Sequence, residues 1–152
     1  SALWVNGTTF ARTEAYDFSG YTVLSGDIDG DSIPEWIMGA PGNNTVEIRN
    51  QDGEPIHTLI GNTGRFGSSL ALGDLDGDGR PELAVGTPAA GRLTEGIVFV
   101  YSTSTWEIIG QWSGEEAGDR LGTALAIHEQ SLWIGLPSAP ERLGSVWRVE
   151  LD

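Results

Sequence analysis

The chain has 152 residues, of which 39% are hydrophobic, and its 22 acidic residues against 8 basic ones give a formal net charge of −14. Phosphate backbones and anionic membranes repel such a surface, and the lack of lysine excludes phosphate-loop and Schiff-base chemistry, so we expect no nucleic-acid partner. The chain has no cysteine for disulfides or thiolate metal sites, and no apolar run approaches the roughly 20 residues of a membrane span, so we expect no membrane insertion.

Two short runs typical of β-strands, residues 2–6 and 8–12, open the chain. A longer phrase follows at residues 19–41: a Ser-Gly pair, an acidic loop and a Gly-Ala-Pro ending. The same phrase recurs at residues 66–88, this time beginning with Phe-Gly and ending with Gly-Thr-Pro. A third, less complete copy spans residues 121–137, and the segment in the place of the acidic loop is about six residues shorter. The chain therefore contains an internal repeat with a period of 47 to 55 residues.

Each copy continues with further short runs that are rich in β-branched and aromatic residues and bounded by Gly, Asn or Ser. These runs cover residues 45–49, 56–60, 97–101, 106–112 and 145–151. We find no convincing amphipathic helix in the sequence. Four short strands per unit at this period are typical of a β-propeller blade.

We therefore predict an all-β protein of about three four-stranded propeller blades, forming one module over residues 1–152. Residues 1–16 supply strands of a preceding or shared blade. Residues 17–63 form the first blade, residues 64–118 the second, and residues 119–152 an incomplete third.

Two acidic loops give the most specific indication of a binding site, because each places carboxylates at positions 1, 3 and 5 and ends in Pro-Glu. Calcium takes six to eight oxygen ligands at about 2.3–2.6 Å, and carboxylates at this spacing in a tight loop can surround one ion. The seventh residue would add a backbone carbonyl and the ninth a further carboxylate. The predicted metal ligands are Asp27, Asp29, Asp31, Ile33 and Glu35 in the first loop, and Asp74, Asp76, Asp78, Arg80 and Glu82 in the second. We expect two calcium ions per chain.

Three other interpretations of the acidic loops are weaker. A helix-loop-helix calcium hand needs a Glu at position 12 and flanking helices, whereas position 12 is Met38 or Val85 inside strand-like runs. Ordinary Asp-Gly turns could explain one loop, but not two with the same ending at the same spacing. Magnesium suits flexible carboxylates less well. The third copy has no carboxylate series at residues 126–131, so we expect no ion there and a plain loop role for His128.

The phrase at residues 66–88, with its acidic loop between Phe-Gly and Gly-Thr-Pro, resembles the FG-GAP repeat of integrin α-subunit β-propellers. The resemblance covers nearly the whole chain. The first copy departs from it with Ser-Gly at residues 19–20, the third lacks the loop, and both loops end in Glu where the family usually has Asp. The resemblance implies calcium loops between the first and second strands of a blade, ligand recognition on the opposite face, and a Gly-Ala-Pro element packed on the Phe-Gly turn.

Closed propellers have at least about four blades, so three blades would leave large exposed edges. We expect a homodimer, in which two copies form a six-bladed ring and the N-terminal strands of one chain complete the last blade of the other. The alternative is that further blades of a larger propeller close the ring.

Little in the sequence supports an enzyme. There is no Gly-x-Ser-x-Gly elbow, and His57 lies in a strand-like run where packing or an edge position explains it. We expect an extracellular or cell-surface module that mediates adhesion or recognition of a protein or glycan ligand, without catalysis. The alternatives are a carbohydrate-binding lectin, and an accessory or structural domain of a larger secreted enzyme.

Six tryptophans are many for a chain of this length, and aromatic faces suit sugars and protein partners. Four of them fall inside predicted strands and are expected in the core between blades: Trp4, Trp36, Trp133 and Trp147. Trp106 and Trp112, in the last strand region of the second copy, are better candidates for exposure and for ligand contact.

Overall fold

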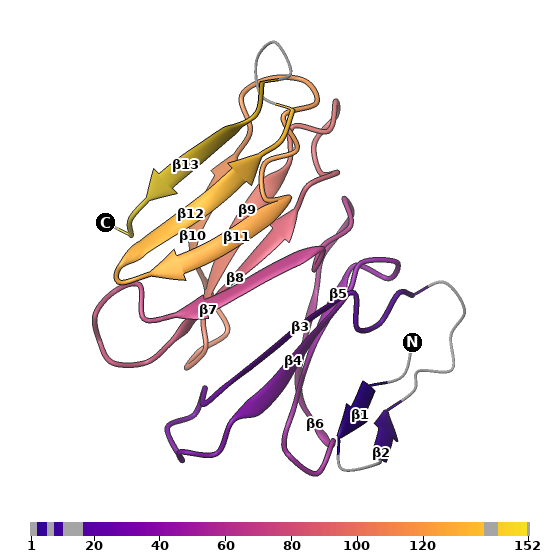
Figure 1. Ribbon diagram of the computed structural model, residues 1–152, viewed down its shortest axis with the longest axis vertical. Coiled ribbons are helices and arrows are strands. Elements are labelled where there is room, and N and C mark those ends of the chain that lie inside the picture. Colours follow the sequence, from indigo (N-terminus) through magenta and orange to yellow (C-terminus); the bar gives the residue numbers. More distant parts are fainter. Residues whose placement is uncertain (1–2, 6–7, 11–16, 139–142, 152) are drawn as a thin grey trace.

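The computed structural model describes residues 3–5, 8–10, 17–138 and 143–151 (Figure 1). Every regular element in this part of the chain is a β-strand. The strands are β1 (Leu3–Val5), β2 (Thr8–Phe10), β3 (Thr22–Gly26), β4 (Glu35–Ala40), β5 (Thr45–Arg49), β6 (Pro55–Ile60), β7 (Ser69–Gly73), β8 (Glu82–Thr87), β9 (Ile97–Ser102), β10 (Ile108–Ser113), β11 (Ala124–His128), β12 (Ser131–Leu136) and β13 (Ser145–Val149). Among the described residues, no helix has the length and apolarity that a membrane crossing requires.

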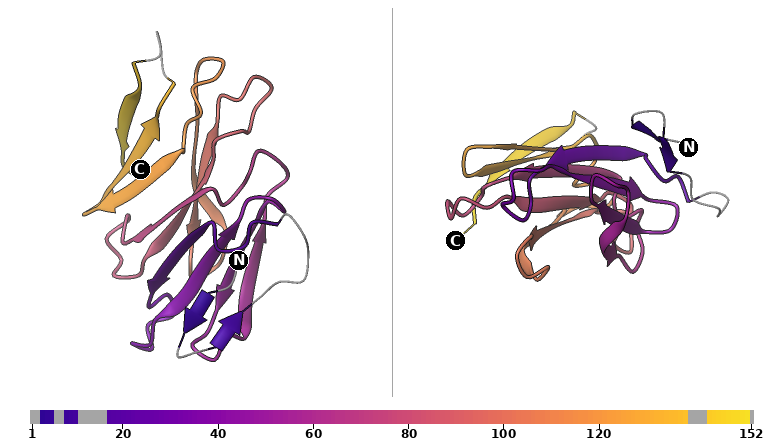
Figure 2. Two further views of the ribbon diagram at one scale, coloured as in Figure 1. Left: turned by 45° about the vertical axis from the view of Figure 1, so that its right-hand side comes forward. Right: turned by 90° about the horizontal axis from the view of Figure 1, so that it is seen from below.

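The strands form antiparallel sheets in which each strand pairs with its neighbours along the chain. Strands β3 to β6 make the first four-stranded sheet, β7 to β10 the second, and β11 to β13 a three-stranded sheet. The first strands of the three sheets lie against one another, with β7 between β3 and β11. The β1–β2 hairpin lies at the end of the molecule remote from β11 to β13 (Figures 1 and 2). The predicted all-β fold of propeller blades is confirmed.

The middle sheet is apolar on both faces because a sheet packs on each side of it. Alternate residues of a strand point to opposite faces. Leu83 and Val85 of β8 therefore join a core with the first sheet, which we call the first core, while Ala84 between them joins a core with the third sheet, the second core. All three side chains are fully buried. This explains the strands without polar alternation in the sequence, since a strand covered on both faces has no solvent side.

The Gly-Ala-Pro and Phe-Gly elements pack together as the resemblance implied. Within the second copy, the N–H of Gly67 donates to the carbonyl of Gly86 over 3.2 Å, and the first and third copies repeat this bond. Between copies, a Cβ atom added to Gly39 would collide with the carbonyl oxygen of Gly67, and one added to Gly86 with that of Gly122. Glycine is therefore required where one sheet's backbone meets the next.

One strand boundary differs from the prediction. Residues 106–112 were expected to form a strand, but β10 begins at Ile108. Trp106 has a φ of 60°, in the left-handed region that strands do not use, and its N–H donates to the carbonyl of Ser102 over 2.8 Å. The bulky residue thus belongs to the turn between β9 and β10.

The tryptophans are also distributed differently from the expectation. Trp147 packs against the second core, but Trp133, expected in the core, is 41% exposed because no sheet of the described chain covers its face of β12. Trp36 is half-buried in β4. The side chain of Trp4 lies outside what the structure describes.

The glycine contact between sheets gives a direct stability test. We expect Gly86→Ala to destabilise the protein by about 3 kcal/mol, because the added methyl group would meet the backbone of Gly122, which cannot move without displacing the third sheet. Gly135→Ala is the matched control in the third sheet, where the nearest atom to an added Cβ is that of Ala124 at 3.3 Å. Urea unfolding of both variants measures the difference, and equal losses would contradict the proposed role of the contact.

Candidate metal centres

The two acidic loops occupy equivalent places in the first two sheets. Residues 27–34 connect β3 to β4, and residues 74–81 connect β7 to β8. In each loop, the last glycine of the first strand is paired with the loop-ending glutamate, Gly26 with Glu35 and Gly73 with Glu82. The loops therefore join the first and second strands of each blade, as the resemblance implied.

Backbone N–H groups hold the aspartates of the first loop in place. Asp27 accepts from the N–H of Gly30 at one carboxylate oxygen, over 2.7 Å, and from that of Ser32 at the other, over 2.9 Å. Asp29 and Asp31 each accept, at their Oδ1 atom, from the N–H two residues further on, over 3.1 and 2.7 Å. The loop thus folds around its own carboxylates in the manner of Asx-turns.

The second loop repeats this arrangement bond for bond. Asp74 accepts from the N–H groups of Gly77 and Gly79, over 2.7 and 3.0 Å. Asp76 and Asp78 again accept from the N–H two residues further on, over 2.9 and 2.7 Å. The same four hydrogen bonds form in both loops although positions 2, 6 and 7 differ, so the shared aspartates, glycine and proline are sufficient to determine the loop conformation.

The glutamate at position 9 is buried under each loop. Glu35 and Glu82 accept at Oε2 from the N–H of Ile28, over 3.0 Å, and of Leu75, over 2.7 Å. Burial raises the pKa of both carboxyl groups above the ordinary value for glutamate; the hydrogen bond from the backbone acts in the opposite direction, and the neighbouring aspartates raise the pKa further. A cation would relieve the repulsion that these carboxylates exert on one another.

The donor set fits a hard divalent cation. In the first loop, carboxylate oxygens of Asp27, Asp29 and Glu35 come within 4.8 Å of one another. In the second loop, the corresponding group is Asp74, Asp76 and Asp78, so Asp31 and Glu82 lie outside these two groups. Asp29, Asp31, Asp76 and Asp78 each keep their Oδ2 atom out of the loop hydrogen bonds, which leaves it for a ligand role. Oxygen ligands of this type are those that calcium prefers.

Position 7 of each loop is exposed, as a residue that contributes only its carbonyl can be. Ile33 is 47% exposed, and the guanidinium of Arg80 donates to the hydroxyl of Ser104 over 3.2 Å. Neither side chain takes part in the carboxylate groups. The prediction that their carbonyls bind the ion remains a prediction.

Thr103, which the sequence did not single out, connects the two loops. Its buried hydroxyl lies 2.7 Å from the carbonyl oxygen of Pro81 in the second loop and 3.3 Å from that of Ile28 in the first. The residue sits in the turn between β9 and β10, where four consecutive Ser and Thr residues gave no signal that one of them is buried. The two acidic loops are thus mechanically linked.

The third copy replaces the loop with a two-residue turn, Glu129-Gln130, between β11 and β12. His128 was expected in a loop, but it is the last residue of β11, where it pairs with Ser131 and its side chain is exposed. Gln130 contacts the second acidic loop, because a Cβ added to Gly77 would collide with its side-chain nitrogen. The short turn therefore packs against the acidic loop of the sheet beside it.

Trp106 and Trp112 are not exposed in the way the ligand prediction required. Trp106 is half-buried on the first core and stacks on His57, with ring centroids 4.4 Å apart and planes 8° from parallel. Trp112 packs against the second core. Both tryptophans are therefore less exposed than expected, and a ligand role for them remains a prediction. His57 lies in the edge strand β6 and stacks on Trp106, in agreement with the edge or packing position expected for it.

Comparison with known proteins finds one family model that matches part of the chain. Residues 66–101 match the model of the FG-GAP repeat. None of the curated proteins matches the sequence. A chain in the crystal structure of the mitotic checkpoint complex shares the fold with a TM-score of 0.54 and 17% identity, over 93% of this chain and 38% of that chain. A protein of unknown function from Bacteroides caccae gives a TM-score of 0.43 and 12% identity, over 78% of this chain and 42% of that chain. The matches thus span less than half of either solved chain.

The buried glutamate gives a prediction for metal-free protein. We expect Glu82→Gln to stabilise the protein in chelator by about 1 kcal/mol, equivalent to a rise in melting temperature of roughly 2–4 °C, because the amide keeps an acceptor for Leu75 without a buried charge. Glu129→Gln, at an exposed position of the third copy, is the control and should leave the melting temperature unchanged. If Glu82→Gln instead lowered the melting temperature in chelator, the buried charge of Glu82 would not be what destabilises the metal-free protein.

Proposed function

We propose that this chain, whose residues 66–101 are an FG-GAP repeat in an integrin-like β-propeller module, binds two calcium ions and serves in extracellular or cell-surface adhesion or recognition. The observation that carries the proposal is the duplicated loop, with the same backbone hydrogen bonds to the same aspartates in both copies. Loops that differ in every position except the acidic ones and the Gly and Pro between them are best explained by one shared ligand.

Calcium is the preferred ion because each loop offers hard oxygen atoms and no nitrogen or sulfur ligand. The loops are exposed at their tips, and extracellular calcium modules bind with dissociation constants of about 10⁻⁴ to 10⁻³ M, a range suited to such open sites. The four formal charges of two bound ions would reduce the net charge of −14 without removing it. The acidic surface that remains is compatible with surroundings rich in divalent cations.

A role in recognition without catalysis agrees with the placement of the titratable residues. His57 is occupied by its stack on Trp106, and the acidic clusters are the loops themselves. A lectin and an accessory domain of a larger secreted enzyme are the alternatives, and a glycan array with and without chelator separates the first from a protein-binding module.

We also propose that another blade covers the open face of the third sheet, supplied by a second copy or by further blades of a larger ring. Ile37 and Ala84 are fully buried by the next sheet, whereas Trp133 at the equivalent position is 41% exposed. Val146 is likewise exposed where Val46 and Val98 are buried. A monomeric protein rarely leaves such apolar positions uncovered on a sheet face.

Isothermal titration tests the metal proposal. We expect the wild-type chain to bind two calcium ions, and the double variant Asp74→Ala and Asp76→Ala to bind one, because the first loop is unchanged. Calcium should raise the melting temperature of the wild type more than that of the variant, whereas in chelator the difference between the proteins is small. The exposed residue Glu129, changed to Ala, is the control. Two ions bound by the double variant would refute the assignment.

Analytical ultracentrifugation in calcium tests the assembly. We expect a dimer at micromolar concentration, and Trp133→Glu to shift it toward monomer, because a buried charge disfavours association. Leu93→Glu, at an exposed apolar residue of another surface, should not change the mass. A compact wild-type monomer that neither calcium nor chelator affects contradicts the dimer.

A further inference from the structure

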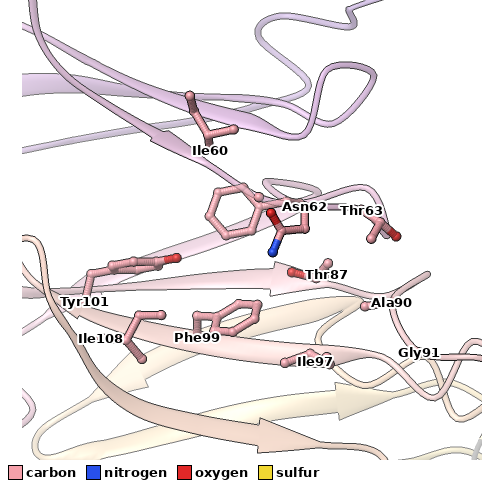
Figure 3. A pocket seen from close by; sticks show the side chains of 12 residues that line it. Ile60, Asn62, Thr63, Thr87, Ala90, Gly91, Ile97, Phe99, Tyr101 and Ile108 are labelled. Carbon is pink, nitrogen blue, oxygen red and sulfur yellow. The ribbon is translucent and has the colours of Figure 1, made fainter.

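A cavity of about 340 Å³ opens between the first and second sheets (Figure 3). Its walls come from the end of β6, from β8, β9 and β10, and from the connection that carries Phe66. Thr87, at the far end of β8 from the acidic loop, lies in this wall. Ile60 and Ile108 also line the cavity and are 75% and 51% exposed, so they flank an opening to solvent. The cavity is therefore accessible and separate from the metal loops.

Three aromatic rings form the inner wall. Phe66, Phe99 and Tyr101 have their ring centroids 6.1 to 6.4 Å apart, and Tyr101 meets Phe66 edge-on at 89°. Phe66 is 1% exposed and Tyr101 8%, so the rings are fixed by the core behind them. Phe99, which is half-buried, is the ring of the three that presents most of its surface to the cavity, and another aromatic ring could pack against it.

A buried hydroxyl without a partner faces this space. Thr87 is 2% exposed, and its Oγ1 atom has no hydrogen-bond partner among the described residues. Leaving such a group unpaired costs free energy, so polar atoms at this depth are nearly always bonded. The fold does not require a hydroxyl here, since the equivalent residues of the other two sheets are Ala40 and Leu136, both buried and apolar.

The remaining polar groups of the cavity are neutral. Asn62 extends its amide and Tyr101 its hydroxyl into the space that the apolar side chains surround (Figure 3). No lining residue is charged. A charged ligand would lose its hydration without a counter-charge, whereas an uncharged ring with one polar atom would satisfy both the aromatic wall and the hydroxyl. The apolar residues of the wall favour a ring with few polar atoms over a sugar, which carries a hydroxyl on nearly every carbon.

We infer that this cavity binds an uncharged phenol-like group, with its ring against Phe99 and Tyr101 and its hydroxyl bonded to Thr87. The volume lies at the low end of the range for ligand pockets and is ample for one aromatic ring. The group can come from a free small molecule or from a tyrosine side chain of a partner. The inference rests on the proposed recognition role, for which it names a ligand. It does not depend on calcium binding.

The cavity can be tested by NMR titration of the ¹⁵N-labelled chain in calcium. Phenol and benzene are a matched pair of probes, because only phenol can bond to the hydroxyl. We expect phenol to shift amide resonances of residues 60–66 and 87–101 saturably, with roughly millimolar affinity, and benzene to bind the same place more weakly. N-acetyl-tyrosinamide distinguishes the sources: tighter binding than phenol indicates a peptide partner, and weaker binding a free small molecule.

Variants of Thr87 separate ligand binding from structure. Thr87→Val keeps the shape and removes the hydroxyl, so phenol affinity should fall about five-fold while benzene affinity is unchanged and the melting temperature does not fall. Thr87→Leu, which copies the third sheet, should weaken binding of both probes, because the larger side chain takes up part of the cavity and removes the hydroxyl. Thr58→Val, an exposed threonine of β6, is the control and should behave as wild type.

Three results would overturn the inference: no saturable shift at these residues with phenol, unchanged phenol affinity in Thr87→Val, or binding of methyl β-glucoside at the cavity in place of phenol. The titration is repeated in chelator, and calcium binding is measured on the same sample. Loss of calcium binding with intact phenol binding, or the reverse, shows which of the two proposals has failed.

Discussion

The close approach of backbone to backbone between successive sheets is the constraint on which the remaining structure depends. Gly39 lies against the carbonyl of Gly67, and Gly86 against that of Gly122, with no room for a side chain. Hydroxyl groups reinforce both contacts, because Thr22 donates to Gly67 over 2.9 Å and Ser69 donates to Gly122. This contact determines how far apart the first strands of neighbouring blades lie. The sheets then diverge toward their outer strands, where larger side chains fill the space.

Both cores and the cavity follow from this divergence. Near the contact, the facing side chains are small or aliphatic, such as Ala71 and Leu70. Further out, the rings of Phe99 and Trp147 occupy equivalent positions in the second and third sheets. Where the third sheet uses Trp147 and Leu136 to fill its space, the second sheet has a smaller ring and a threonine. The same repeat therefore produces a filled interface in one place and an open one in the other.

The sequence predicted the elements whose determinants are local and repeated. The strand pairs, the place of the acidic loops and the packing of the Gly-Ala-Pro element all follow from spacing that occurs two or three times in the chain. Burial of single side chains was less predictable. Trp133 lies on a strand like its repeat equivalents, but its exposure depends on whether another sheet follows in space. Trp106 depends on a left-handed turn conformation that a bulky residue does not suggest.

The acidic loops have a consequence for the dynamics of ion capture. Because backbone N–H groups already hold Asp27, Asp29 and Asp31, the entropy of ordering the loop is lost when the chain folds and not when an ion arrives. If the loops bind calcium as we propose, a preorganised loop of this kind would admit the ion with little rearrangement, so its occupancy should follow rapid changes in ion concentration. Because Thr103 bridges the two loops, an ion bound in one loop would also restrict the motion of the other.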